Sequence, residues 1–434
     1  MACGSGGRCL GDVGGRTERR RKSLKWGTLM RAIIAGGGIG GLAAAMALRQ
    51  VGADVQVYES VPELKPLGVG INLLPHAMGV LAELGLVERI LPLGVATREL
   101  AYFNKFGQAI WSEPRGRFAG YDQPQLSVHR GRLQMALLEA ASERLADGAI
   151  HMDRELVAFQ QDAAGVRATF VDASGATHGE SGDVLIGADG IHSTLRAAFF
   201  PEEGPPAYSG RVLWRATTQA PPFLSGATMI MAGHRRQKFV AYPLTPPDSR
   251  GLATINWIAE LPREAFLTRE NWNRLGDVAD FLPAFEDWRF DWLDVPALIR
   301  GASSIYQFPM VDRDPLPFWS RGRVTLLGDS AHPMYPIGSN GASQAILDAR
   351  ALADALANAA DPADALARYQ DVRLPATAAI VRANRADGPE QCMDIAEARA
   401  PNGFNDIAEV VSRAELEEIA ARYKQVAGFA IARR

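Results

Sequence analysis

The stretch that decides the fold spans residues 31–60 and reads "RAIIAGGGIGGLAAAMALRQVGADVQVYES". A short apolar run at Ala32–Ala35 leads into three glycines spaced as G-x-G-x-x-G. An Ala- and Leu-rich segment follows and stops at Gly52, and a second apolar run ends on Glu59. This order predicts a strand, a tight turn, a helix and a second strand, the unit that opens a dinucleotide-binding α/β fold.

Each part of this unit has a physical task. Gly36 permits the tight turn, Gly38 lets a pyrophosphate approach the backbone, and Gly41 lets the helix pack closely on the strand. The helix N-terminus offers free N–H groups and a partial positive charge to phosphates. Glu59 is placed to accept hydrogen bonds from the hydroxyls of an adenosine ribose. The alternative is a purely structural glycine turn, and the motif alone does not separate NAD from FAD.

Two later segments repeat the pattern of a strand followed by a turn. In "GDVLIGADGIHSTLR", residues 182–196, an apolar run turns at Asp189, and Ser193 is a candidate helix cap. In "RVTLLGDSAHPMYPIGSNGASQAILDA", residues 323–349, Asp329 follows an apolar run. Ligands of open α/β sheets bind at the carboxyl ends of strands. We therefore predict that Asp329 binds a ribityl or ribose hydroxyl at the far end of the dinucleotide, with a turn-forming aspartate as the alternative.

A helix is predicted to begin near Gly341, after the proline-containing loop. Its first N–H groups, at Gly341 and Ala342, would point back over that loop. If a flavin ring lay there, these donors would meet its N1–C2 carbonyl edge, where negative charge collects on reduction.

The three segments, in this order and spacing, resemble the motifs of the group A flavoprotein monooxygenases, which are FAD-dependent aromatic hydroxylases. The resemblance covers residues 30–385. Within the family, "KPLGVGINLLPHA" (65–77) and "FPMVDRDPLPFWSRGRVTLLGDSAH" (308–332) are most similar to the phenazine hydroxylase branch. Enzymes that resemble salicylate hydroxylase are further away.

This resemblance implies non-covalent FAD that is reduced by NAD(P)H, a transient co-substrate. Reduced flavin would capture O₂ as a C4a-hydroperoxide and transfer one oxygen to a phenazine-, salicylate- or quinolone-like ring. The flavin would be the reagent, so no catalytic side chain is assigned. The resemblance also implies that Arg130, in "SVHRGRLQMALL", reaches the phosphates or the flavin, with a surface arginine as the alternative. The predicted cofactor-binding residues are Gly36, Gly38, Gly41, Glu59, Arg130, Asp189, Asp329, Gly341 and Ala342.

Two departures from the family pattern concern the predicted site. The loop at 339–343 reads Ser-Asn-Gly-Ala-Ser, where Gly-Gln-Gly-Ala-Asn is usual. The glycine before the helix is kept, so backbone contacts are expected to survive. His76 stands where an asparagine is usual, and either a site residue or a structural histidine is compatible with that place.

The middle of the chain has a different pattern. Short aromatic and β-branched runs, "RVLWRATT", "ATMIMAG", "KFVAYPLT" and "LATINWIAE", predict a mostly antiparallel sheet that covers a flat ligand. For side chains on this sheet, core packing is the alternative to substrate contact. A helical stretch is predicted over 263–297. The predicted pocket residues are His76, Trp214, Tyr242, Asn256, Trp257 and Pro336.

The predicted fold class is therefore α/β: a Rossmann-like FAD-binding domain, built from a parallel sheet with helices, carries an inserted, mostly antiparallel β-sheet substrate domain and a helical C-terminal segment. Residues 1–29 hold seven basic and two acidic residues, and we predict a disordered basic extension before a natural start at Met30. A basic targeting arm is the alternative. The remaining predicted boundaries are 30–100, 129–200 and 311–385 for the FAD-binding domain, 101–128 and 201–310 for the substrate domain, and 386–434 for the helical segment.

The composition of the chain limits the kinds of partner and the cellular location that we expect for the protein. The net charge of −3, without a basic block in the body of the chain, argues against nucleic acid. Cys3, Cys9 and Cys392 lack metal-ligand spacing, and no metal is expected. So few cysteines suit a reducing cytoplasm, and no apolar run reaches the roughly 18 residues of a membrane span. A monomer or homodimer is expected. The alternative functions are a flavin-dependent dehydrogenase or reductase and a non-catalytic dinucleotide sensor.

Overall fold

The computed structural model describes residues 30–264, 274–386 and 388–428. The predicted basic extension therefore lies outside the described residues. The opening unit folds as predicted, with strand β1 at Arg31–Ala35, helix α1 at Ile39–Gln50 and strand β2 at Asp54–Tyr58. β1 and β2 pair in parallel, so both strands end at the same edge of their sheet.

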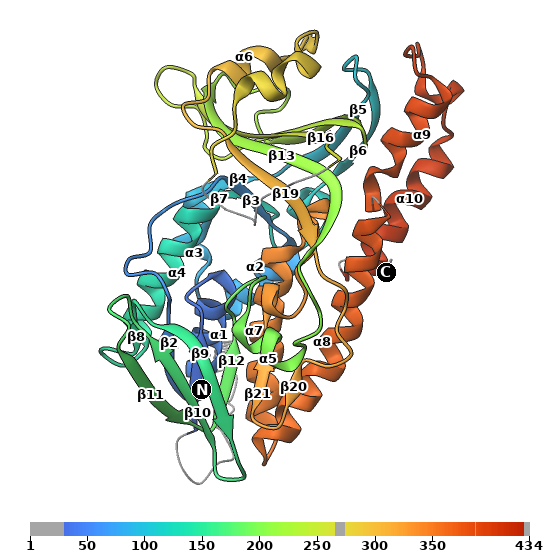
Figure 1. Cartoon of the computed structure of the whole chain (residues 1–434). Helices are drawn as coiled ribbons and strands as arrows, with labels where there is room; N and C mark the ends of the chain where they lie inside the picture. Colours follow the sequence, from blue (N-terminus) through green and yellow to red (C-terminus); the bar gives the residue numbers. More distant parts are fainter. Residues whose placement is uncertain (1–29, 265–273, 387, 429–434) are drawn as a thin grey trace, which may run out of the picture.

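A six-stranded sheet carries this unit, in the order β20-β21-β12-β1-β2-β8 (Figure 1). The pairings are parallel except for the edge strand β20. The strands that follow β2 in this sheet are β8 (Ile150–His151), β12 (Val184–Gly187), β20 (Ser320–Arg321) and β21 (Val324–Leu326). Because β1, β12 and β21 are adjacent and parallel, the three sequence motifs that follow them meet at one sheet edge.

Helices pack around this sheet and close the main core. Seven of the twelve residues of α1, including Leu42 and Leu48, are at most 2% exposed because alanines let neighbouring elements approach closely. A β-carbon on Gly40 would lie 2.8 Å from Leu327 and 3.1 Å from Ala345, so α1 lies directly against the third motif. The other helices near this sheet are α2 (Pro75–Glu83), α3 (Val87–Ile90), α4 (Arg130–Arg144), α5 (Thr194–Phe199), α7 (Gly341–Asn358) and α8 (Pro362–Arg385).

Two small antiparallel sheets flank the parallel sheet. One comprises β9 (Glu155–Gln161), β10 (Val166–Val171) and β11 (Thr177–Gly182). The other comprises β3 (Gly70–Leu73), β7 (Leu126–His129) and β4 (Gly94–Ala96), with β7 in the centre.

A seven-stranded sheet forms the upper layer in Figure 1, in the order β19-β13-β16-β15-β14-β5-β6. Only the β14–β5 pairing is parallel, so the prediction of a mostly antiparallel sheet is confirmed. Its strands are β5 (Glu99–Phe103), β6 (Ala109–Pro114), β13 (Ala207–Ala220), β14 (Thr228–His234), β15 (Gln237–Pro243), β16 (Ala253–Pro262) and β19 (Tyr306–Asp312).

The helical prediction for 263–297 is wrong for the residues that the structure describes. Residues 274–294 form 3₁₀ turns at Val278–Asp280 and Leu282–Phe285 and the short strands β17 (Arg289–Phe290) and β18 (Leu293–Asp294). Helix α6 begins only at Val295 and ends at Arg300. Two features explain the difference. Proline in the second 3₁₀ turn cannot donate a helical hydrogen bond. The aromatic side chains pack inward against the large sheet instead of along one face of a helix.

The C-terminal segment is helical, as predicted. Helices α9 (Gln391–Arg399) and α10 (Arg413–Val426) follow α8 and run along one side of the molecule toward the large sheet (Figure 1). A buried ionic cluster joins this segment to the sheet, because Lys238 Nζ lies 2.6 Å from Glu390 and 2.8 Å from Glu260.

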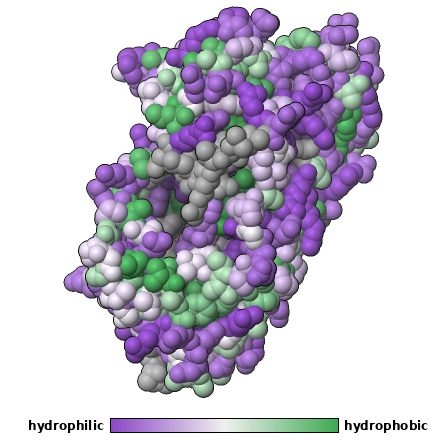
Figure 2. Space-filling model, viewed as in Figure 1, coloured by the Kyte–Doolittle hydropathy of each residue, from purple (hydrophilic) through white to green (hydrophobic). Residues whose placement is uncertain are grey.

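Hydrophilic residues predominate on the face of the molecule seen in Figure 2. The exposed large apolar side chains come from separate parts of the chain, for example Val61, Phe118, Leu224 and Val372. Within the described ranges, no helix has the length and apolar character needed to cross a membrane.

Candidate cofactor and active site

The glycine turn after β1 has the geometry that its spacing predicts. Gly36 has φ of +113°, and a β-carbon there would lie 2.2 Å from the carbonyl oxygen of Ala188. A β-carbon on Gly41 would lie 2.0 Å from the Gly36 carbonyl oxygen, so these two positions require glycine. At Gly38, by contrast, a β-carbon would meet no atom within 4 Å. Gly38 therefore borders open space at the N-terminus of α1, and no side chain caps that helix.

Glu59 follows β2 and faces the same turn. Its Oε2 accepts a hydrogen bond from the Gly37 amide at 2.7 Å, and Oε1 accepts from the Val61 amide at 3.1 Å. These bonds fix the carboxylate beside the glycine turn while the side chain keeps partial solvent access. Ser60 Oγ also donates to Oε1 at 3.1 Å. A carboxylate has room for about four hydrogen bonds, so about one acceptor position remains for a ribose hydroxyl.

Asp329 follows β21 at the same sheet edge. It is solvent-exposed, and desolvation by the surrounding protein raises its pKa. The charges of His332 and Arg130 oppose this rise in the Asp329 pKa. Arg130 is the first residue of α4 and is solvent-exposed. Its charge acts on Asp329, 199 residues away in the sequence, so the two side chains lie within electrostatic range of each other.

The loop that carries Asp329 is held from below by a buried polar network that sequence reasoning missed. Asp348 Oδ2 accepts hydrogen bonds from the Gly328 amide at 3.0 Å and from His332 Nε2 at 2.6 Å. Arg373 Nε donates to Asp348 Oδ1 at 2.7 Å. Burial opposes ionisation of Asp348, but its interactions with His332 and Arg373 lower its pKa to about 2. The available signal was an acidic residue at a buried position of the amphipathic helix α7.

Asp189 joins the second and third motifs. One of its oxygens accepts from the Thr194 amide at 2.8 Å, and the other accepts from Ser330 Oγ at 3.0 Å. Arg196 strengthens this junction, since its NH1 group donates to the carbonyl oxygens of Ser330 and Ala331 at 3.1 and 2.9 Å. Asp189 thus positions the motif-bearing loops, and burial raises its pKa.

Ser193 caps α5 as predicted, because its Oγ accepts from the Arg196 amide at 3.0 Å. The role of the Arg196 side chain was missed, although the residue closes the second motif.

The N-terminus of α7 also faces outward without a side-chain cap. A β-carbon on Gly341 would meet nothing within 4 Å, and Ala342 is only partly buried. Asn340, which precedes the helix, is fully buried and donates from Nδ2 to the hydroxyl oxygen of Tyr423 at 2.8 Å. Pro336 lies exposed in the same loop. The helix end is therefore open, and its preceding loop is anchored by α10.

The large sheet separates the predicted pocket residues by face. Trp214 and Trp257 are fully buried in an aromatic cluster with Phe281, on the face turned away from the cofactor motifs. We therefore treat both tryptophans as core residues and leave them out of the proposed pocket. Period-two alternation puts Tyr242 and Asn256 on the other face, where they pair across β15 and β16.

Three side chains of this inner face gather around Gly70 of β3. The Gly70 amide donates to Asn256 Oδ1 at 2.7 Å, and Arg215 NH2 donates to the Gly70 carbonyl at 2.9 Å. A β-carbon on Gly70 would lie 2.8 Å from both Asn256 and Tyr242. Sequence reasoning missed Arg215, since an arginine in an aromatic strand is as compatible with a surface position.

His76, on α2, is partly buried near the start of α7. Its Nε2 lies 3.4 Å from Nε2 of Gln344, and the Oε1 atom of Gln344 accepts a hydrogen bond from Arg373 at 2.7 Å. Burial, together with the charge of Arg373, lowers the His76 pKa to about 4. The side chain is therefore neutral near pH 7.

These features suit a long ligand with phosphates in its middle and hydroxyls toward both ends. Two uncapped helix N-termini, those of α1 and α7, offer N–H groups without an acidic residue in the first turn. Glu59 and Asp329 supply carboxylates at two strand ends, and the open space at Gly38 admits a phosphate against the backbone. FAD has this form, and the residues present fit it.

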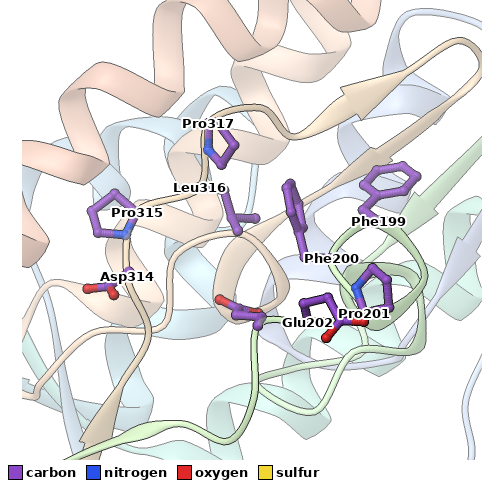
Figure 3. Close-up of a pocket in the computed structure, with 9 residues that line it drawn as sticks. Phe199, Phe200, Pro201, Glu202, Asp314, Pro315, Leu316 and Pro317 are labelled. Atoms are coloured by element: carbon purple, nitrogen blue, oxygen red, sulfur yellow. The ribbon is translucent and has the colours of Figure 1, made fainter.

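A separate pocket of about 410 Å³ lies between the segment after α5 and the loop after β19 (Figure 3). It is lined by the apolar side chains of Phe199, Phe200 and Leu316 and by the acidic residues Glu202 and Asp314. It shares no residue with the predicted cofactor set. No group of three or more metal-ligating side chains occurs in the ranges that the structure describes.

Comparison with known proteins identifies the chain's family. The family model described as "FAD binding domain" matches residues 30–275 and 300–384. The chain belongs to this FAD-binding family. Among curated relatives, it is 46% identical over 360 residues to phenazine 1,6-dicarboxylic acid hydroxylase PhzS of Lysobacter antibioticus, covering 81% of this chain and 88% of that protein.

A second curated relative and a solved structure support the same family. Identity is 30% over 362 residues to 6-hydroxynicotinate 3-monooxygenase of Bordetella bronchiseptica, covering 81% of this chain and 90% of that protein. Among solved structures, Klebsiella pneumoniae HpxO complexed with FAD and uric acid matches with a TM-score of 0.73 and 25% identity, covering 92% and 96% of the two chains. The chain is thus an FAD-dependent aromatic monooxygenase, and its expected fold class is confirmed.

Proposed function

We propose that this enzyme hydroxylates a phenazine-like heteroaromatic acid, using NAD(P)H and O₂. The observation that carries the proposal is the 46% identity to a phenazine 1,6-dicarboxylic acid hydroxylase over most of both chains. The balanced reaction converts one aromatic C–H bond to C–OH, consumes O₂, NAD(P)H and a proton, and releases water and NAD(P)⁺. Bound FAD supplies the redox chemistry, and the protein supplies binding, orientation and exclusion of water.

The proposed cofactor residues act by position. The amides at the start of α1 would receive the pyrophosphate, and Glu59 would accept hydrogen bonds from the adenosine ribose. Arg130 would offset phosphate charge, while Asp329 would accept from a hydroxyl on the flavin side. The amides of Gly341 and Ala342, at the positive end of α7, would stabilise negative charge on the ring. Asp189 would act through Ser330 and Thr194 by holding the loops in place.

We propose that the substrate lies between the loop at Pro336 and the inner face of the large sheet. Tyr242 and Asn256 lie on that face, and His76 stands near the start of α7. Residues 101–128 and 201–310 would then form the substrate domain, and 30–100, 129–200 and 311–385 the FAD-binding domain. We further propose a cytoplasmic enzyme, where NAD(P)H is available, acting as a monomer or homodimer.

Turnover with isotopically labelled O₂ tests the proposal. The purified holoenzyme is mixed with NADH or NADPH and phenazine-1,6-dicarboxylate. O₂ consumption is followed, and the mass of the product is measured by mass spectrometry. We expect substrate-stimulated oxidation and one labelled oxygen atom in the product. Oxidation of NAD(P)H with a reduced or dehydrogenated product and no labelled oxygen would instead establish a dehydrogenase or reductase.

A further inference from the structure

Arg215 is a cation on the inner face of the large sheet. It lies on β13, where burial lowers its pKa and its side chain keeps only partial solvent access. Its contacts are the Gly70 carbonyl oxygen at 2.9 Å, the Tyr242 hydroxyl, and the Phe308 ring, whose centre lies 5.9 Å from the guanidinium carbon. All three contacts are uncharged.

Two other arginines with little solvent access, Arg211 and Arg373, have carboxylate partners. On the same strand, Arg211 NH1 lies 2.9 Å from Glu260, and Arg373 Nε lies 2.7 Å from Asp348. Within the described ranges, Arg215 makes no salt bridge, and its Nε has no hydrogen-bond partner. A desolvated guanidinium without a counter-charge is costly to keep, and this one also lies close enough to Arg130 to feel its repulsion.

A second unpaired donor lies beside it. Asn256 is fully buried, and its Nδ2 has no partner among the described residues, while its Oδ1 is bound to the Gly70 amide. The side chains of Asn256 and Tyr242 both lie over Gly70. Three side chains that can donate hydrogen bonds therefore meet at one place: Arg215, Tyr242 and Asn256. Among the described residues, none of the three is paired with a carboxylate there.

We propose that Arg215 is a specificity-determining residue that binds a carboxylate of the aromatic substrate. Arginine matches a carboxylate in a planar, two-point geometry that an amide or a hydrogen atom cannot reproduce. The Tyr242 hydroxyl and Asn256 Nδ2 are further donors to the same anion, and the Phe308 ring offers an apolar surface to the adjacent aromatic system. This assignment rests on the proposed function, and it narrows the substrate to aromatic acids.

A structural role for the same residues makes a different prediction. If Arg215 only attaches β3 to the large sheet through Gly70, its loss lowers stability and affects all ligands alike. If it binds a carboxylate, its loss affects acids and spares their uncharged analogues. The two cases are separated by comparing phenazine-1-carboxylate with phenazine-1-carboxamide, which have the same shape and differ in charge.

The experiment measures the dissociation constants of both ligands by perturbation of the flavin absorbance spectrum, which needs no turnover. Wild-type holoenzyme is expected to prefer the carboxylate by on the order of 10- to 100-fold, the usual range for a charged hydrogen bond. Arg215→Gln should bring the ratio near one by weakening only carboxylate binding, and Arg215→Lys should give an intermediate ratio. The matched control is Arg211→Gln, which should keep the wild-type ratio.

An unchanged ratio in folded Arg215→Gln, or no preference in the wild type, would overturn the assignment. If Arg215→Gln fails to retain FAD, the ratio in Arg215→Lys and Tyr242→Phe decides instead, and wild-type ratios in both would also overturn it. Failure of the proposed function looks different: the wild type would then release no hydroxylated product with any phenazine acid, whatever its binding ratio.

Discussion

The hydroxyl oxygen of Tyr423, in the C-terminal helix α10, lies 2.8 Å from Nδ2 of Asn340, the residue that immediately precedes α7. Both residues are buried, and the Tyr423 hydroxyl also lies 2.9 Å from Asn384 Oδ1. A β-carbon on Gly338 would collide with this hydroxyl. The loop proposed to lie beside the flavin ring is therefore packed on a side chain from the far end of the chain.

Tyr423→Phe should leave the fold intact and disturb this loop. The change removes one of the two acceptors of Asn340 Nδ2 and the donor to Asn384 Oδ1, and a buried polar group left unpaired costs about 1–3 kcal/mol. We expect a lower melting temperature and a larger share of NAD(P)H oxidation that ends in hydrogen peroxide rather than product. The matched control is Tyr369→Phe, which removes one buried hydroxyl, 3.1 Å from the Leu326 carbonyl. Equal peroxide yields in the two variants would show that Tyr423 has no special role.

His76 should make the enzyme sensitive to mild acid. Its folded pKa of about 4 lies below the ordinary value of 6.5, so the unfolded chain binds the proton more readily between these pH values. Stability is therefore full above about pH 6.5 and is lost as pH falls toward 4, by up to about 3 kcal/mol. Asp348, with a pKa of about 2, acts in a lower window.

Urea unfolding of His76→Asn and wild type from pH 7 to 4 measures this effect. The variant should lose less stability over that range, because it lacks the titrating group. Parallel stability curves would contradict the proposed burial of a neutral His76.

Gly38→Ala should separate folding from cofactor binding. The added methyl group meets no protein atom within 4 Å, and φ at this residue is −72°, which alanine adopts readily. It would occupy space where the pyrophosphate approaches the backbone. The apoprotein should melt like wild type, while FAD affinity measured by fluorescence titration falls at least about tenfold. Gly79→Ala, also open at its β-carbon position, is the matched control and should bind FAD normally.

Local patterns predicted much of the fold. Apolar runs followed by glycine turns located β1, β12 and β21, and short aromatic and β-branched runs located the four strands from β13 to β16. These signals succeed because each depends on neighbouring residues alone. The helical prediction for 263–297 was wrong in the described part, because its aromatic residues from Phe281 to Trp292 pack on a sheet whose position the sequence does not give.

Contacts between residues far apart in the sequence could not be predicted. The carboxylate of Asp348 binds the Gly328 amide 20 residues away, and Arg215 reaches the Gly70 carbonyl over 145 residues. No local sequence pattern indicates either of these two contacts. The sequence also did not show which face of the large sheet each side chain occupies. Trp214 and Tyr242 were therefore both predicted as pocket residues, although they lie on opposite faces of the sheet.

The most direct test of the account is the FAD affinity of Asp329→Ala, measured by titrating apoprotein with FAD. Asp329 is solvent-exposed, so its loss should not unfold the chain, whereas Asp348→Ala, which breaks a buried ion pair, should cost about 3–5 kcal/mol of stability. The account predicts that Asp329→Ala melts like wild-type apoprotein, binds FAD about 10–150-fold more weakly, and regains activity with excess FAD. Asp329→Asn should be milder. Wild-type FAD affinity and turnover in Asp329→Ala would contradict the claim that this carboxylate holds the cofactor.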